Sequence, residues 1–167
     1  MLDWAPSDRR QTSETSSMFT FFGLFADPVS GLSEQAVRAW PDMDMVRIDR
    51  PIQAIAIRFH ADSYDRERDE IPKPVVRAVE SLSRAFPDAR FLLLRTECYD
   101  GQCTNWGRII RNGEVVLDAD RDGALRRLIL HWGVDIGPLE IFDPLSREFP
   151  WGSPRRRPST AQSKPSQ

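Results

Sequence analysis

Hydrophobic positions recur with helical spacing in the segment 72–86, which is the clearest element of the chain. Its prolines lie at the beginning, where the first turn of a helix tolerates them. The apolar side chains fall on one stripe, made by Val75, Val79, Leu82 and Phe86. This pattern predicts an amphipathic helix that packs its stripe against a core.

Two shorter stretches have the same period. Residues 33–40 are predicted to form a helix that Ser33 caps. Residues 121–132 are predicted to form a third helix, with Asp120 as its N-cap and Gly133 as its stop.

Other apolar segments predict strands. Residues 18–26 form a compact run rich in phenylalanine, which is typical of a buried strand. Residues 45–61 alternate between apolar and polar positions and read as one extended stretch. Within it, Pro51 lacks a backbone N–H and therefore requires an edge position or a bulge.

Two tight turns, at residues 100–101 and 112–113, join three further strands into a meander. Asp-Gly and Asn-Gly are strong hairpin signals because both turn positions need positive φ. Centring the turns on these dipeptides predicts the cross-strand pairs Tyr99–Gln102, Cys98–Cys103, Arg95–Trp106 and Arg111–Glu114. The same register aligns Phe91, Ile110 and Val115 on one face, and Leu92, Ile109 and Val116 on the other. The base of the meander should therefore be buried on both sides.

The element order β-α-β-α-β-β-β-α indicates an α+β fold. We expect one mixed or mainly antiparallel sheet of about five strands, with helices mostly on one face. Residues 18–152 are predicted to form a single domain, over which 134–151 wrap back. Polar composition predicts a flexible lead at 1–17, a charged loop at 61–70 and a disordered tail at 153–167.

Charge and composition narrow the function classes. The net charge is only -2, which gives no electrostatic reason to expect nucleic acid or an anionic membrane as partner. No apolar run approaches the ~20 residues of a membrane helix, and the first residues lack the apolar core of a secretion signal. We therefore expect a cytoplasmic location, where thiols stay reduced. The 23 basic residues include only two lysines, which is typical of a GC-rich, bacterial genome.

The two cysteines, Cys98 and Cys103, are cross-strand neighbours in the predicted register. A bond between them would close a loop that the turn already closes, so its stabilising effect is small. We favour two reduced, mainly structural thiols. The alternatives are a redox-sensitive pair and a metal site, which would require His60 and His131 to converge on the hairpin.

The meander turns polar and aromatic towards its tip, and these side chains are our candidates for a partner-binding surface: Arg95, Glu97, Tyr99, Trp106 and Arg108. Arg95 should stack on Trp106 across the strands. Trp and Arg are enriched in binding hot spots. The alternative is that Trp106 packs beneath the C-terminal segment.

The sequence "DADRDG" at 118–123 resembles the first half of a calcium loop. Ile129 stands where the bidentate glutamate belongs, so helix capping is the better interpretation. We find no hydrolase, phosphate-loop or zinc-protease motif. The sequence thus predicts no catalytic residue, metal or cofactor.

These observations favour a small cytoplasmic bacterial protein-binding domain. The most specific hypothesis is an immunity protein that neutralises a cognate toxin by direct binding, with a protein partner and neither nucleic acid nor membrane. One alternative is a small-ligand binder or enzyme with a pocket under the C-terminal segment. The other is a thiol-based redox regulator that uses Cys98 and Cys103.

Overall fold

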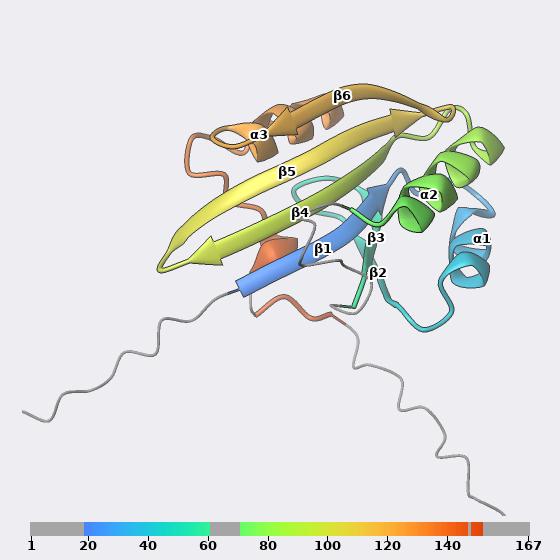
Figure 1. Cartoon of the computed structure of the whole chain (residues 1–167), viewed down its shortest axis with the longest axis horizontal. Coiled ribbons are helices and arrows are strands. Elements are labelled where there is room, and N and C mark those ends of the chain that lie inside the picture. The colour runs from blue at the N-terminus through green and yellow to red at the C-terminus, as the bar shows by residue number, and fades with distance from the viewer. Residues whose placement is uncertain (1–18, 61–70, 147, 152–167) are drawn as a thin grey trace, which may run out of the picture.

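Six strands form one antiparallel sheet in the order β2-β3-β1-β4-β5-β6 (Figure 1). The computed structural model describes residues 19–60, 71–146 and 148–151. The expectations for 1–17, 61–70 and 153–167 lie outside these residues. The strands are β1 (Phe19–Ala26), β2 (Asp44–Ile48), β3 (Ala54–Arg58), β4 (Phe91–Tyr99), β5 (Gln102–Arg111) and β6 (Glu114–Asp120), and the α-helices are α1 (Leu32–Ala39), α2 (Lys73–Ala85) and α3 (Ala124–Ile129).

The sheet has one strand more than the sequence predicted, because the extended stretch 45–61 divides. Its two halves, β2 and β3, pair antiparallel to each other as a hairpin. The connection contains Pro51, which follows a cis peptide bond. Proline has no N–H for a ladder bond, so here it lies in a connection between strands instead of at a bulge.

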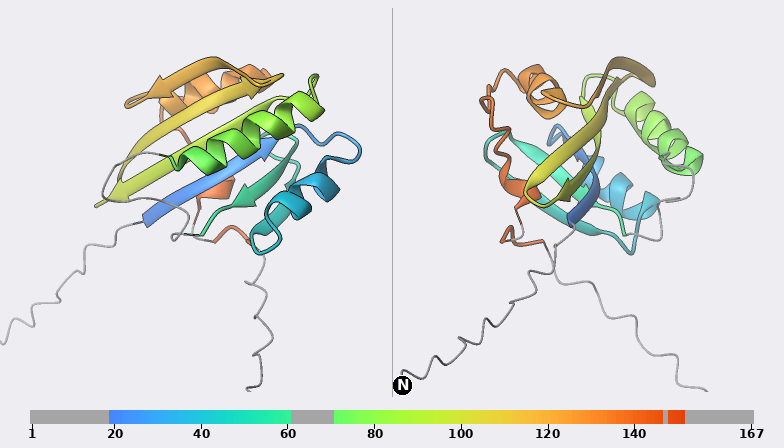
Figure 2. Two further views of the ribbon diagram at one scale, coloured as in Figure 1. Left: turned by 45° about the vertical axis from the view of Figure 1, so that its right-hand side comes forward. Right: turned by 60° about the vertical axis from the view of Figure 1, so that its left-hand side comes forward.

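The two faces of the sheet carry different layers (Figure 2). α1 and α2 cover one face, and α3 and the C-terminal segment cover the other. Along β4 the side chains alternate between them, so that Leu93 packs on the α2 side and Leu92 on the α3 side. Both are fully buried, which explains why β4 begins as an unbroken apolar run.

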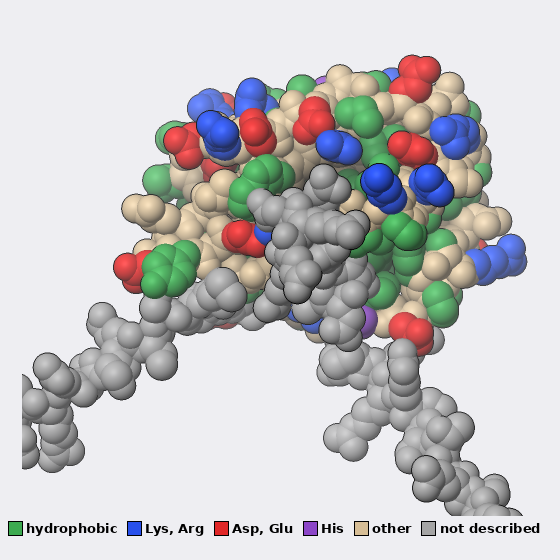
Figure 3. Space-filling model, viewed as in Figure 1, with side chains coloured by type: hydrophobic (Ala, Val, Ile, Leu, Met, Phe, Trp, Pro, Cys, Tyr) green, Lys and Arg blue, Asp and Glu red, His purple; other side chains and the backbone are tan. Residues whose placement is uncertain are grey.

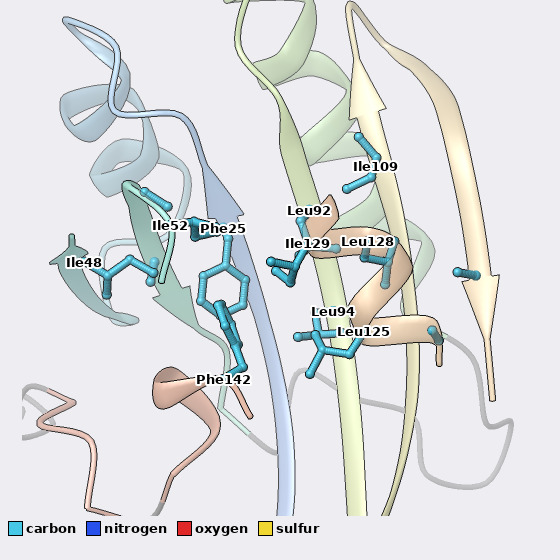
Figure 4. Packing of buried hydrophobic residues seen from close by; sticks show 14 of the residues in the cluster. Phe25, Ile48, Ile52, Leu92, Leu94, Ile109, Leu125, Leu128, Ile129 and Phe142 are labelled. Atoms are coloured by element: carbon cyan, nitrogen blue, oxygen red, sulfur yellow. The ribbon is translucent and has the colours of Figure 1, made fainter. Parts of the chain in front are cut away.

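On the α3 side, apolar side chains from several elements meet at the centre of the sheet (Figure 4). Leu125, Leu128 and Ile129 of α3 reach the sheet from one end of this layer. The C-terminal segment completes it, with the Phe142 ring 5.2 Å from Phe25. The prediction that 134–151 wraps back over the sheet is confirmed for its described residues.

The structure confirms the predicted hairpin register, from Phe91–Ile110 to Tyr99–Gln102 and at Arg111–Glu114. The prediction for Val116 is wrong, because a bulge lies between Ile109 and Ile110 and Leu117 takes its place opposite Ile109. The prediction that the β6 side of the meander base is buried is also wrong, since Val115 and Val116 are 46% and 50% exposed. They lie on β6, which is the last strand of the sheet and has no described strand on its outer side.

Two predicted N-caps differ in the structure. α1 starts after Gly31 and α3 after Gly123, both in the left-handed conformation, so neither Ser33 nor Asp120 is the N-cap. Asp120 instead belongs to β6, where it pairs with Trp106 of β5. Gly133 does end the helical segment after α3, as predicted, with φ 73°.

An ion pair joins the ends of β1 and β4 to the segment after α3. Arg90 donates to both carboxylate oxygens of Asp27, at 2.9 and 2.8 Å, and the Trp132 indole donates to the same carboxylate at 3.0 Å. Burial raises the pKa of Asp27, but the bonds from Arg90 and Trp132 outweigh it and hold that pKa below its usual range.

The C-terminal segment has polar anchors as well. Arg126 of α3 binds Asp135 through two bonds of 2.6 Å, and this lowers the pKa of Asp135 to about 2. Glu140 accepts bonds from the backbone of Arg126 and from Asn105 of β5. These contacts fix the segment over the α3 side of the sheet. No helix among the described residues is long and apolar enough to span a membrane.

Candidate functional site

A groove of about 890 Å³ runs between α2 and the strands β4, β5 and β6. We call it the α2 groove. Its α2 wall includes Lys73, Val76, Arg77 and Glu80, and its sheet wall includes Arg95, Trp106, Arg108, Asp118 and Asp120. Basic and acidic side chains are interspersed over the face of the molecule that carries α2, β5 and β6 (Figure 3).

The strand register explains why these side chains share one wall. Arg95 of β4 pairs with Trp106 of β5, which pairs in turn with Asp120 of β6. The neighbouring row has Arg108 beside Asp118. Because every second side chain of a strand points to the same face, both rows lie on the α2 side of the sheet.

Arg95 and Trp106 form a fixed pair in the sheet wall. The guanidinium carbon of Arg95 lies 4.8 Å from the centre of the Trp106 ring, which confirms the predicted cation–π contact. Arg95 is only 5% exposed and forms an ion pair with Glu97. Its burial holds the guanidinium in place, so the indole is presented on a rigid support.

The acidic side chains of β6 lie at the rim of the groove. Asp118 accepts a bond of 2.9 Å from Arg108, and Asp120 lies 3.9 Å from Arg121. All four side chains are at least 42% exposed, so these ion pairs contribute little to stability. Within the described ranges, no group of three or more His, Cys, Asp or Glu side chains is arranged to hold a metal ion. The calcium-loop resemblance therefore gains no support from the geometry.

The α2 wall supplies two cations that sequence analysis missed. Lys73 and Arg77 are four residues apart and lie on one side of the helix. Neither forms an ion pair with another described residue. One signal was present, because Lys73 is one of only two lysines in the chain.

The five predicted partner-binding residues are not equivalent. Arg95, Trp106 and Arg108 line the α2 groove. Glu97 lies nearer the hairpin turn and forms the ion pair with Arg95, and Tyr99 is 65% exposed at the turn itself.

The alternative position for Trp106, beneath the C-terminal segment, is wrong. The C-terminal segment covers the α3 side, whereas Trp106 lines the groove on the α2 side. It is the preceding residue, Asn105, that faces the C-terminal segment and binds Glu140.

A disulfide joins Cys98 and Cys103, whose Cα atoms are 4.0 Å apart, so our preference for reduced thiols is wrong for this structure. The predicted register itself explains the bond, because it places the two side chains directly opposite each other. The two histidines do not converge on this pair. The His60 ring lies 2.9 Å from the Asp42 carbonyl oxygen, and His131 follows α3 on the other side of the sheet.

The chain matches no family model, and neither curated proteins nor solved structures give a match.

Proposed function

We propose that this protein acts by binding a partner protein, and that the α2 groove is the contact surface. One observation carries the proposal: the buried Arg95 fixes the Trp106 indole in the wall of an open groove. The opposite wall carries Lys73 and Arg77, which form no ion pair with another described residue. Arginine and tryptophan are the residues in which binding energy concentrates. Side chains that are already fixed lose little entropy on binding, which favours affinity.

The mixed charges of the α2 groove support specificity. Lys73 and Arg77 lie on the helix wall, while Asp118 and Asp120 lie on the opposite rim. A partner must match both signs in the correct order, and a partner with the reverse order meets like charges. Such a surface selects one partner over others of similar shape.

Within this class we propose an immunity protein that blocks a cognate toxin. This narrower proposal rests on the chain's size, its slight excess of acids and the aromatic and charged surface of the groove. The test is growth rescue, in which the product of a neighbouring toxin-like gene is expressed with this protein. Rescue of growth by the wild type, with loss of rescue by Trp106→Ala, supports the proposal. Growth arrest that persists when the wild type is co-expressed with the toxin-like product contradicts it.

Partner capture tests the binding proposal itself. The wild type, Trp106→Ala and Trp40→Ala are immobilised and exposed to lysate of the native cells. Trp40 is the matched control, because it is also half-buried but packs on Phe59, away from the groove. A stoichiometric protein held by the wild type and Trp40→Ala, but not by Trp106→Ala, is the expected result. Equal capture by all three excludes the groove as the contact surface.

A small anionic ligand is the second candidate, because the groove volume suits one and two cations lie along one wall. This site is not the predicted pocket under the C-terminal segment, since it lies on the other side of the sheet. Titration of the protein with a panel of mono- and dicarboxylates and phosphates tests this candidate. Saturable binding that is lost on Arg77→Ala would favour it over a protein partner.

The cytoplasmic location and the redox role stay predictions. A cross-strand disulfide is more typical of oxidising compartments. Alkylation of the protein in native cells before lysis, followed by mass measurement, shows whether Cys98 and Cys103 are bonded there. Two alkylated thiols support a cytoplasmic location, and a shift between the two forms under peroxide supports redox regulation.

A further inference from the structure

β6 is an edge strand whose outer side is open in the described part of the chain. It is the last strand of the sheet and pairs with β5 alone. Among the described residues, the Arg127 side chain donates to the Asp120 carbonyl, and no other hydrogen bond reaches the backbone of β6 from outside the sheet. An edge strand with free N–H and C=O groups is a template for a further strand.

The side chains of β6 show what kind of strand would fit. Asp118 and Asp120 are 58% and 65% exposed and lie on the groove side, two residues apart. Val115 and Val116 are half-exposed nearer the start of the strand. Of the features that commonly protect edges, β6 has acidic side chains and a bulge at Val116, but neither lysine nor proline. The edge thus has an acidic end and an apolar end.

A second copy of the same chain fits this edge poorly in the two registers that pair the middle of the strand with itself. If two β6 strands paired antiparallel about Leu117, Glu114 of each would lie opposite Asp120 of the other. If they paired about Val116, Glu114 would lie opposite Asp118. Both arrangements place like charges directly opposite each other, which destabilises a strand pair.

We propose that the partner contributes an extended segment that adds to the outer edge of β6. Two basic residues, one residue apart, lie over Asp118 and Asp120, and apolar residues lie over Val115 and Val116. Main-chain hydrogen bonds give affinity and alternate side chains give selectivity, as in other cases of strand addition. This inference rests on the proposed function and deepens it. Because Asp118 and Asp120 also form the groove rim, the added strand delivers the partner's groove-side side chains to Trp106.

Synthetic peptides of about eight residues, the length of an ordinary strand, provide the probe. One contains Arg-Thr-Arg-Thr-Val-Val and a second contains the reverse order, since the added strand can run in either direction. Binding to the full chain is followed by fluorescence anisotropy. We expect one of the two peptides to bind with an affinity that falls as salt rises. Replacement of both arginines by glutamate, or N-methylation of alternate amides, should abolish this binding.

Val116→Lys tests the edge directly, because a lysine there is the usual protection against strand addition. It should weaken peptide binding by about tenfold or more. Val37→Lys is the matched control, since Val37 is 46% exposed on α1 and Val116 is 50% exposed. It should leave binding unchanged. Asp120→Asn should weaken the arginine peptide and reduce its salt dependence.

Equal binding of the peptide to the wild type and Val116→Lys would overturn the inference, as would equal binding of the N-methylated peptide or absence of binding by both peptides. The captured partner separates this failure from that of the proposed function. If the captured partner no longer binds Trp106→Ala but still binds Val116→Lys, the groove remains the binding site and strand addition at β6 is excluded. A partner retained by Trp106→Ala contradicts the proposed function, whatever the peptides do.

Discussion

At the scale of single residues, Asp27 has a defined electrostatic role. Its carboxylate lies between Arg90 and Trp132 and is 14% exposed, while Arg90 is 32% exposed. The folded pKa of Asp27 is lowered, so the native state favours the charged form. The stability contributed by this preference is present above the unfolded pKa of about 3.9 and is lost as the pH falls through the lower folded pKa.

Asp27→Asn removes this contribution. We expect the free energy of unfolding at pH 7 to fall by about 1–2 kcal/mol, since charge-assisted hydrogen bonds are lost. The variant should also lose less stability than the wild type between pH 5 and pH 3. Urea titrations at a series of pH values measure both effects. Asp49→Asn is the control, because Asp49 is 75% exposed beside Arg47. Parallel pH curves for the wild type and Asp27→Asn would contradict the assignment.

Gly107 is a second residue whose identity the packing requires. A Cβ at this position would lie 2.7 Å from Leu128 Cδ1 and 3.0 Å from the Leu93 carbonyl oxygen. Gly107→Ala should therefore destabilise the fold by about 1–3 kcal/mol through overpacking between β5 and α3. Thermal unfolding measures the change, with Gln102→Ala at an exposed position of the same strand as control. A melting temperature equal to that of the wild type would show that α3 can shift at little cost.

The sequence predicted individual residues best where a turn fixes their position. The register from Asp100-Gly101 placed Arg95 beside Trp106, and the structure confirms the contact. Lys73 and Arg77 were missed because their neighbours across the groove are more than fifteen residues away in sequence. No local pattern reveals which strand a helix will cover.

At the scale of elements, the β4–β5 hairpin carries both the disulfide and the sheet wall of the groove. The bonded cysteines are five residues apart in sequence. The Asp-Gly turn already holds the strand ends together, so the bond removes little further freedom from the unfolded chain.

The double substitution Cys98→Ser, Cys103→Ser should lower the free energy of unfolding by less than about 2 kcal/mol. The Arg95–Trp106 pair lies further along the hairpin, so partner affinity should not change. Chemical denaturation and partner titration check the two statements, and the wild type in reducing agent should behave like the variant. A loss of binding on reduction would instead support the redox hypothesis.

Elements were predictable from sequence to the extent that their signals were local. The long helix, the meander and the buried first strand were predicted from period and turn residues. The split of 45–61 into β2 and β3 was missed, since alternation continues on both sides of Pro51. Burial of Val115 and Val116 was overestimated, because the sequence does not show that β6 is an edge strand.

At the scale of the whole molecule, the sheet separates two environments. The α3 side is filled by α3 and the aromatic C-terminal segment, whereas on the α2 side the residues that the structure describes leave a groove along β4 to β6. The sequence predicted the composition of the hairpin but not the side of the sheet on which its charged residues lie. That depends on strand order, which is set by contacts between distant parts of the chain.

The central claim is that the α2 groove binds a partner through Trp106. The most direct test measures partner affinity and melting temperature on the same preparations of wild type, Trp106→Ala and Trp40→Ala. Trp106→Ala should weaken the complex by about 2 kcal/mol or more, roughly thirtyfold in Kd, and remain folded. Trp40→Ala should lower the melting temperature by several degrees, because it loses the contact with Phe59, and keep its affinity. If Trp106→Ala instead lowers the melting temperature and binds the partner with unchanged affinity, Trp106 is structural and the groove is not the binding site.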